Sequence, residues 1–173
     1  MIKAYIIVAQ TADGKIARDS NHEADWTSKA DKRHFIEMTK KSGVMVMGLN
    51  TFKTFPSPLK DRLHIVYSND HNSEKDNIPG VVEYTKDSPD VLLKKLEERG
   101  FKEIAICGGT SIYTMFIQSG LVKNLYITIE PRMFGEGMSI CNQTVDIRMK
   151  LKSVKVISEE NVLLLDYEIV SEK

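Results

Sequence analysis

Short apolar runs that alternate with helical segments are the feature that most constrains how this chain can fold. Such runs occur at residues 2–9, 44–47, 63–67, 81–84 and 104–107. Helix start and stop signals bound the segments 27–39, 50–55, 88–99 and 109–118. Because strands that alternate with helices form a mainly parallel sheet with helices on both faces, we expect a three-layer α/β fold.

The C-terminal third has a different pattern. A sixth apolar run at 125–129 is followed by two long β-rich runs at 151–157 and 162–170, with polar residues between them. This arrangement predicts an antiparallel hairpin that closes one edge of the sheet. The 173 residues contain no repeat or linker. We therefore expect one domain over residues 1–173, with a mostly parallel central sheet and an antiparallel C-terminal strand.

Charge and hydropathy exclude several classes of protein. The chain carries 24 basic and 24 acidic residues, so it lacks the basic excess that is typical of nucleic-acid or membrane-surface binders. No apolar run approaches the roughly 20 residues of a membrane span, and the N-terminus does not resemble a signal peptide. We expect a cytoplasmic protein whose partner is a small molecule, with no nucleic acid and no membrane.

Histidine and cysteine usage gives no support for metal chemistry. None of these side chains shows the spacing of metal ligands, and two cysteines do not make a disulfide framework. Cys107 ends an apolar run and is expected to be a small buried hydrophobe. The four histidines are His22, His34, His64 and His71, and the two cysteines are Cys107 and Cys141.

An acidic side chain lies on the apolar stripe of the first predicted helix. The helix begins after Thr27 or Ser28, and Asp31 then falls on the same face as Phe35 and Met38. A carboxylate in that position is costly unless something pairs with it. One interpretation is that Asp31 only favours the helix N-terminus. The other is that Asp31 binds a ligand.

Two predicted strands end at glycines that lead directly into helices. The run 44–47 is followed by Gly48 and then by Asn50-Thr51, and the run 104–107 is followed by Gly108-Gly109. Glycine allows the backbone to approach a ligand closely, and a helix N-terminus offers unpaired N–H groups to phosphate. Either turn alone is more often structural, and the GxGxxG fingerprint is absent. Two such turns in one domain indicate a dinucleotide.

Together these segments resemble dihydrofolate reductase and its wider fold family over nearly the whole chain. The matching segments are residues 9–16 with Asp13-Gly14-Lys15-Ile16, the set Trp26, Asp31, Phe35 and Thr39, the segment Val46-Met47-Gly48 with Thr51-Phe52, the segment Pro58-Leu59 with Arg62, the segment Gly108-Gly109 with Ile112-Tyr113, and the strand Leu125-Tyr126-Ile127-Thr128.

The resemblance implies an NADPH-dependent reduction of 7,8-dihydrofolate by hydride transfer. Asp31 would anchor the pterin ring and help a proton to reach N5, with Thr128 as its hydrogen-bond partner and Trp26 beside it. The loop 17–26 would act as a lid. Substrate contacts are implied at Val8, Phe35, Phe55, Leu59, Arg62 and Cys107. Cofactor contacts are implied at Ala9, Ile16, Gly48, Asn50, Thr51, Ser68, Gly108, Gly109, Thr110, Ser111, Ile112 and Tyr113.

The chain departs from the dihydrofolate reductase pattern in places. Leu49 stands where many members carry an arginine for the NADP 2′-phosphate, and Lys32 replaces an apolar residue beside Asp31. The segment 120–137 resembles the reductase domain of riboflavin biosynthesis, which reduces a ribosylaminopyrimidine phosphate. We favour dihydrofolate and keep that pyrimidine as the alternative, with a non-catalytic cofactor binder as a third hypothesis. The family's members are monomers or homodimers.

Overall fold

The elements of the structure, a computed structural model, follow the predicted order closely. The structure describes residues 2–70 and 73–170, so His71 lies outside it. The strands are β1 (Lys3–Thr11), β2 (Val44–Gly48), β3 (Leu63–Tyr67), β4 (Val82–Thr85), β5 (Glu103–Gly108), β6 (Val122–Glu130), β7 (Arg148–Ile157) and β8 (Val162–Val170). The α-helices are α1 (Lys29–Ser42), α2 (Leu49–Lys53), α3 (Pro89–Glu98) and α4 (Thr110–Gln118), and the short 3₁₀ turns are η1 (Ala24–Trp26) and η2 (Ser73–Asp76).

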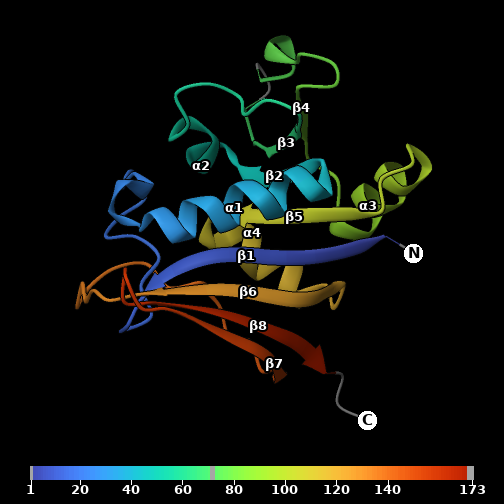
Figure 1. Cartoon of the computed structure of the whole chain (residues 1–173). Coiled ribbons are helices and arrows are strands. Elements are labelled where there is room, and N and C mark those ends of the chain that lie inside the picture. Colours follow the sequence, from blue (N-terminus) through green and yellow to red (C-terminus); the bar gives the residue numbers. More distant parts are fainter. Residues whose placement is uncertain (1, 71–72, 171–173) are drawn as a thin grey trace.

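All strands of the described residues belong to one eight-stranded sheet in the order β4-β3-β2-β5-β1-β6-β8-β7 (Figure 1). Neighbouring strands are parallel from β4 to β6. Only β8 runs the other way, antiparallel to both β6 and β7. The predicted parallel sheet with an antiparallel C-terminal strand is confirmed.

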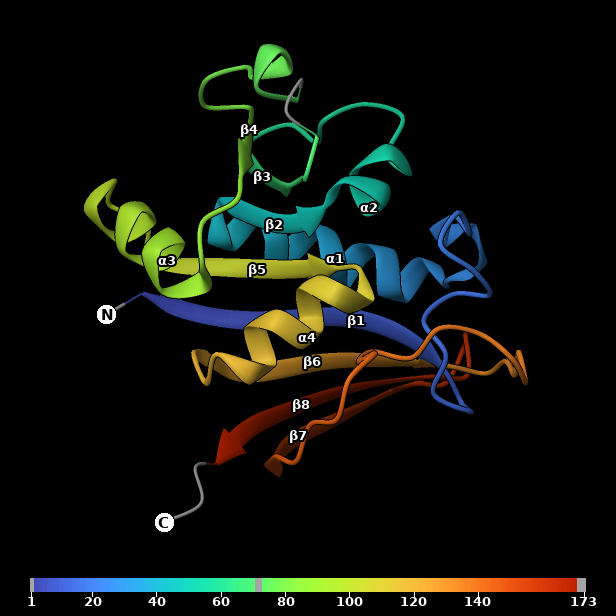
Figure 2. The same cartoon turned by 180° about the vertical axis from the view of Figure 1, so that it is seen from behind.

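Helices cover both faces of the sheet and make the three expected layers. Helix α1 crosses the face seen in Figure 1, whereas α3 and α4 cover the opposite face, seen in Figure 2. The core under α1 includes Tyr5 and Met45. The core under α3 and α4 includes Leu96 and Phe116, which are fully buried. Alternate residues of β1 and β2 therefore serve opposite cores, as expected of a sheet buried on both sides.

Capping fixes the ends of α1. The Oγ atom of Ser28 accepts a hydrogen bond from the N–H of Asp31 at 3.1 Å, so Ser28 rather than Thr27 is the N-cap. Gly43 ends the helix in the left-handed conformation, with φ of 71°, and donates its N–H to the carbonyl of Thr39. This geometry places Asp31 in the first turn of α1.

Two strands are longer than their apolar runs predict. Strand β6 begins at Val122, which pairs with Ala4 of β1, and β7 begins at Arg148, which pairs with Val170 of β8. Backbone pairing with a neighbour extends both strands through polar residues, which hydropathy alone does not reveal.

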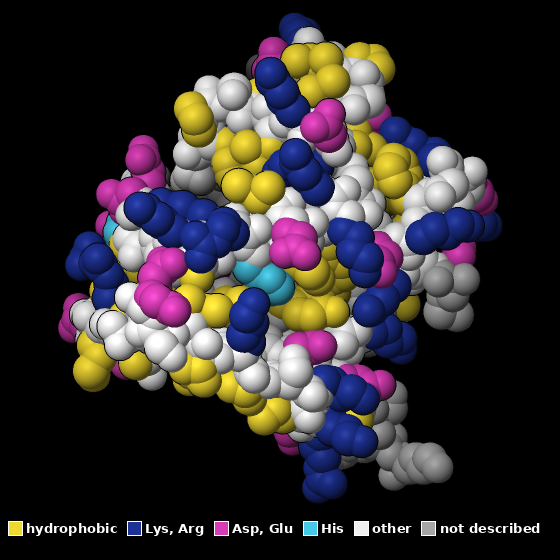
Figure 3. Space-filling model, viewed as in Figure 1, with side chains coloured by type: hydrophobic (Ala, Val, Ile, Leu, Met, Phe, Trp, Pro, Cys, Tyr) yellow, Lys and Arg dark blue, Asp and Glu magenta, His cyan; other side chains and the backbone are white. Residues whose placement is uncertain are grey.

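Strand β7 is an exposed edge of the sheet. Every residue from 148 to 156 is exposed, including the apolar Leu151, Val154 and Val156. Lysines at positions 150, 152 and 155 are interspersed among them. In Figure 3, apolar side chains follow the lower border of the molecule, and lysine, arginine and acidic side chains are mixed over the rest of the visible face. Within residues 2–70 and 73–170, no helix combines the length and apolar character needed to cross a bilayer.

Packing of α3 against the sheet makes a first prediction. Leu96 is fully buried, whereas Val91 on the same helix is 40% exposed. We expect Leu96→Ala to lower the free energy of unfolding by about 2–5 kcal/mol, because a buried cavity replaces the lost side chain. Val91→Ala, the matched control, should change it by less than about 1 kcal/mol. Urea unfolding of both variants tests this, and equal losses would contradict the assignment of the core face.

Candidate functional site

A large cleft lies at the carboxyl ends of the central strands. Its volume is about 1690 Å³, and its lining includes Ala9 of β1, Gly48 of β2 and Cys107 of β5. Helices α1 and α4, on opposite faces of the sheet, contribute Asp31 and Ser111 to the walls. Ligands of open parallel sheets bind at this edge, and the volume exceeds that of a typical single-ligand pocket.

The two glycine turns meet inside this cleft. Strands β2 and β5 are neighbours, and Met47 pairs with Gly108. A Cβ atom added to Gly109 would lie 3.3 Å from the Oγ1 atom of Thr51, and one added to Gly48 would lie 3.4 Å from a side-chain carbon of Ile112. At both positions a side chain would crowd a neighbouring side chain, so glycine allows the two turns to pack closely against α2 and α4.

Helix α4 begins directly from the second glycine turn. Gly109 is its N-cap, and the first intrahelical bond runs from the N–H of Ile112 to the carbonyl of Gly109 at 3.0 Å. The N–H groups of Thr110 and Ser111 precede that bond and lie at the cleft. This helix start fits the pyrophosphate of a dinucleotide.

Asp31 is buried on the α1 wall of the cleft. Its side chain is part of the lining, although the residue is only 9% exposed. Burial raises the pKa of the carboxyl above its usual value, and the hydroxyls of Thr128 and Thr27 act in the opposite direction. Smaller effects come from Glu130, which raises the pKa, and His34, which lowers it. A carboxyl with a perturbed pKa in a cleft is a candidate functional group.

Apolar side chains surround the cleft near Asp31. The rings of Phe35 and Phe55 are stacked, with centroids 6.3 Å apart and an interplanar angle of 19°. Leu59 also lines this part of the cleft, and its N–H donates to the Nε2 atom of His64 at 3.1 Å. A flat ring whose polar edge faces Asp31 would have apolar walls on its faces.

Two of the predicted site residues lie behind the cleft wall. Thr128 is 1% exposed and reaches the site only through Asp31. Arg62 is 8% exposed, and its Nε and Nη1 atoms have no hydrogen-bond partner among the described residues. Desolvation lowers the pKa of its guanidinium. Buried guanidinium nitrogens without partners are costly, so Arg62 is suited to bind an anion.

The loop that follows β1 is fastened by a segment after β6. The N–H of Ile16 donates to the carbonyl of Met138, and the N–H of Met138 donates to the carbonyl of Ala17, both at 2.8 Å. The carboxylate of Asp13 accepts from the N–H groups of Phe134, at 3.2 Å, and Gly135, at 2.7 Å. The 17–26 loop thus closes one end of the cleft, and the segment 134–138 holds the start of this loop in place. This role of the segment was not predicted from the sequence.

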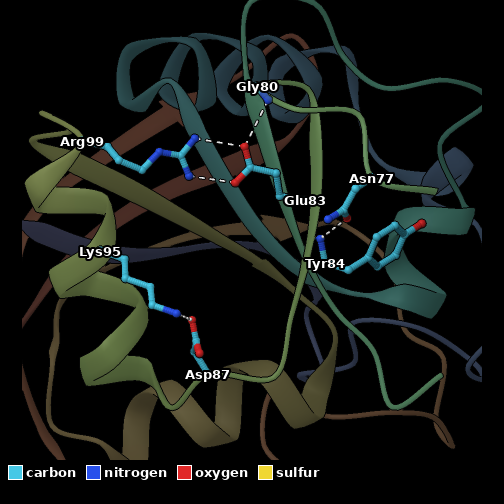
Figure 4. Close-up of polar contacts among 7 residues, drawn as sticks. All are labelled: Asn77, Gly80, Glu83, Tyr84, Asp87, Lys95 and Arg99. Atoms are coloured by element: carbon cyan, nitrogen blue, oxygen red, sulfur yellow. Dashed lines mark hydrogen bonds and ion pairs between the residues drawn. The ribbon is translucent and has the colours of Figure 1, made fainter. Parts of the chain in front are cut away.

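The far end of the cleft, beyond the glycine turns, is lined by Ser68 and Asp87. Lys95 of α3 donates to the carboxylate of Asp87 at 2.8 Å, as Figure 4 shows. Next to it, both terminal nitrogens of Arg99 contact the carboxylate of Glu83, at 2.7 and 3.0 Å (Figure 4). These pairs connect β4 and the segment after it to α3 and the residue that follows it.

Most of the predicted site residues come together in the cleft. Its lining includes Val8, Ala9, Ile16, Trp26, Asp31, Phe35, Gly48, Asn50, Thr51, Phe55, Leu59, Ser68, Cys107, Gly108, Gly109, Thr110, Ser111, Ile112 and Tyr113. Lys86, Met138 and Asn142 also line it, although no sequence motif singles them out. In the described parts of the chain, no group of three or more His, Cys, Asp and Glu side chains is placed to hold a metal ion.

A sequence profile described as "RibD C-terminal domain" matches residues 4–163. The chain belongs to this family. One relative is the riboflavin biosynthesis protein RibD of Actinobacillus pleuropneumoniae, which is 32% identical over 90 residues. The matched residues make up 46% of this chain and 23% of that protein. Dihydrofolate reductase type 9 of Escherichia coli is 28% identical over 132 residues, covering 74% of this chain and 70% of the relative. The chain thus matches less than a quarter of RibD.

Comparison with solved structures confirms the fold of this chain. A pyrimidine reductase-like protein from Corynebacterium diphtheriae superimposes with a TM-score of 0.78 and 15% identity, covering 99% of this chain and 93% of that one. Dihydrofolate reductase from Enterococcus faecalis, complexed with NADP(H), gives a TM-score of 0.73 and 21% identity, covering 98% and 97%. The predicted likeness to the dihydrofolate reductase fold family is confirmed.

Gly137 tests the fastening of the 17–26 loop. A Cβ atom at Gly137 would lie 2.5 Å from the carbonyl oxygen of Ala17, whereas one at Gly135 would meet nothing within 4 Å. Both glycines have positive φ, so Gly135→Ala controls for backbone strain. We expect Gly137→Ala to speed proteolysis of the loop several-fold more than Gly135→Ala. Limited proteolysis measures this, and equal rates would contradict the role of the contact.

Proposed function

We propose that this chain is an NADPH-dependent reductase that transfers hydride to a substrate containing a pyrimidine ring. One observation carries the proposal: the buried carboxyl of Asp31 and the glycine turns at Gly48 and Gly108-Gly109 line the same cleft. A ring held by Asp31 and a dinucleotide held at the turns would therefore lie side by side. Such alignment, with water excluded, is what a protein contributes to hydride transfer.

The cleft fits the cofactor at its centre. Thr110 and Ser111 at the start of α4 would hold the pyrophosphate with their backbone N–H groups. The bound cofactor would supply the hydride. The Enterococcus faecalis relative was solved with NADP(H), which supports the choice of nucleotide.

The pyrimidine ring would be held by its N–H edge. An ionised Asp31 can accept two parallel N–H bonds, an arrangement that is strong where water is excluded. Thr128 would fix the carboxylate through its hydroxyl, while Phe35 and Phe55 cover the faces of the ring. The proton that accompanies hydride transfer would reach the substrate through water near Asp31.

Two substrates fit this scheme, and the similarity to known proteins changes which of them is favoured. Sequence reasoning favours dihydrofolate, but the family profile over 4–163 supports the ribosylaminopyrimidine phosphate of riboflavin biosynthesis more strongly. Lys32, beside Asp31 on the cleft, offers an ammonium group to a phosphate. Dihydrofolate remains the second candidate, supported by the Escherichia coli relative and by Arg62, which could receive a glutamate carboxylate.

The deciding experiment is a turnover assay of the purified chain. NADPH oxidation is followed at the nicotinamide absorbance band, in parallel, with the ribosylaminopyrimidine phosphate and with dihydrofolate. We expect faster turnover of the former, and preference for dihydrofolate would reverse the order. NADPH binding with no oxidation by either substrate would support the non-catalytic hypothesis.

Asp31 provides the test of the ring anchor. We expect Asp31→Asn to lower kcat/KM by about 100-fold or more, with NADPH affinity unchanged. Asp25→Asn, another carboxylate of the cleft lining, should have a small effect. Steady-state kinetics and NADPH titration measure these changes.

Thermal melting of Asp31→Asn separates a loss of activity from a loss of folding. The pKa of Asp31 is raised in the folded chain, so its ionisation above the unfolded-state pKa favours the unfolded chain. Asparagine has no such cost, and Asp31→Asn should therefore melt at the same or a higher temperature at pH 7. Wild-type kcat/KM in this variant would remove Asp31 from the mechanism.

Leu49 makes the cofactor preference testable. It lines the cleft directly after Gly48 and cannot pair with a 2′-phosphate, and the carboxylates of Asp70 and Asp87 line the same end. We expect Leu49→Arg to raise the ratio of kcat/KM for NADPH over NADH by about tenfold, because an arginine–phosphate pair is strong. Leu49→Met controls for packing. An unchanged ratio in both variants would place the adenosine elsewhere.

A further inference from the structure

Carboxylates from the other end of the sequence hold the N-terminus of α1. The N–H and the Oγ atom of Ser28 both donate to the Oε1 atom of Glu130, at 2.9 and 2.8 Å. The N–H of Ala30 donates to the Oε2 atom of Glu160 at 3.1 Å. Negative charge is favourable at a helix N-terminus, so both acids stabilise this end of α1.

Glu130 is connected to Asp31 through Ser28. The Oγ atom of Ser28 donates to Glu130 and accepts from the N–H of Asp31, at 2.8 and 3.1 Å. Glu130 is 2% exposed and does not line the cleft. It ends β6, the strand that also carries Thr128. A single buried carboxylate therefore joins the strand behind the cleft to the first turn of the helix that carries Asp31.

We propose that Glu130 is a positioning residue for Asp31, which it orients through Ser28 and beside which it places a second negative charge. The proposal rests on the proposed function only in treating Asp31 as the ring anchor. Glu130 touches neither the space for substrate nor that for cofactor, so it acts through its neighbours.

The charges around Asp31 support the second part of this proposal. Glu130 faces Asp31 from β6 and raises its pKa, whereas His34, one turn along α1, lowers it. His34 is itself influenced by Glu37, Lys155 and Asp166. Two buried carboxylates in one region disfavour each other's ionised form.

Glu160 provides a matched control. It lies at the same helix end, where it accepts from Ala30 and pairs with Arg33 at 3.2 Å, and it is not among the main influences on the pKa of Asp31. Glu130→Gln keeps an oxygen that can accept from Ser28 but removes the charge. Glu160→Gln removes one charge from the same helix end. A general effect on α1 would appear in both variants.

The experiment is a ¹³C NMR titration of the Asp31 carboxyl, assigned by the loss of its resonance in Asp31→Asn. We expect Glu130→Gln to lower the titration midpoint by about 0.5 to 1 pH unit, and Glu160→Gln to leave it in place. No shift in Glu130→Gln, or equal shifts in both variants, would overturn the proposal. The titration requires no substrate, so it can succeed even where the turnover assay fails.

The link through Ser28 is tested separately. Ser28→Ala removes the hydroxyl that joins Glu130 to Asp31 but keeps both carboxylates. We expect it to lower kcat about tenfold with unchanged NADPH affinity, and Ser28→Thr to restore most of the rate. Wild-type kcat in Ser28→Ala would refute the positioning role. This result stands even where Glu130→Gln does not fold.

Discussion

The structure of the site depends on one interaction: the burial of the Asp31 carboxyl between the first helix and the end of β6. Burying an acid costs free energy, and the hydroxyls of Thr27 and Thr128 offset only part of that cost. The position of α1 must therefore be secured by other contacts, which Ser28 and Glu130 supply. An unfavourable group is held in place by the surrounding fold, as is common where a protein binds ligands.

Local patterns in the sequence predict most of the fold. The succession of strand, glycine pair and helix around Gly108-Gly109 is confirmed, and so is the burial of Asp31. Both features could be predicted because the residues that determine them lie within a few positions of one another. The partners of the α1 N-terminus could not be predicted in this way. Glu130 is 102 residues from Ser28, and Glu160 is 130 residues from Ala30, so only the folded sheet brings them together.

The choice of substrate illustrates a second limit of the sequence. The motifs around Asp31, Gly48 and Gly109 belong to the proposed ring anchor and the proposed cofactor site, which a fold family can share among several substrates. What separates those substrates is the periphery of the cleft, where Lys32 lines the wall and Arg62 lies behind it. Single side chains at the rim carry little periodic signal, and the family comparison was needed to change the order of the two candidates.

The exposed edge at β7 has a consequence for how copies of the chain meet. Free backbone groups and apolar side chains on an edge strand invite further strands to add to the sheet. Here the lysines at 150, 152 and 155 would have to give up water and face the like charges of an identical strand. The edge therefore discourages growth of a continuous intermolecular sheet, which protects the chain from aggregating through its C-terminal hairpin.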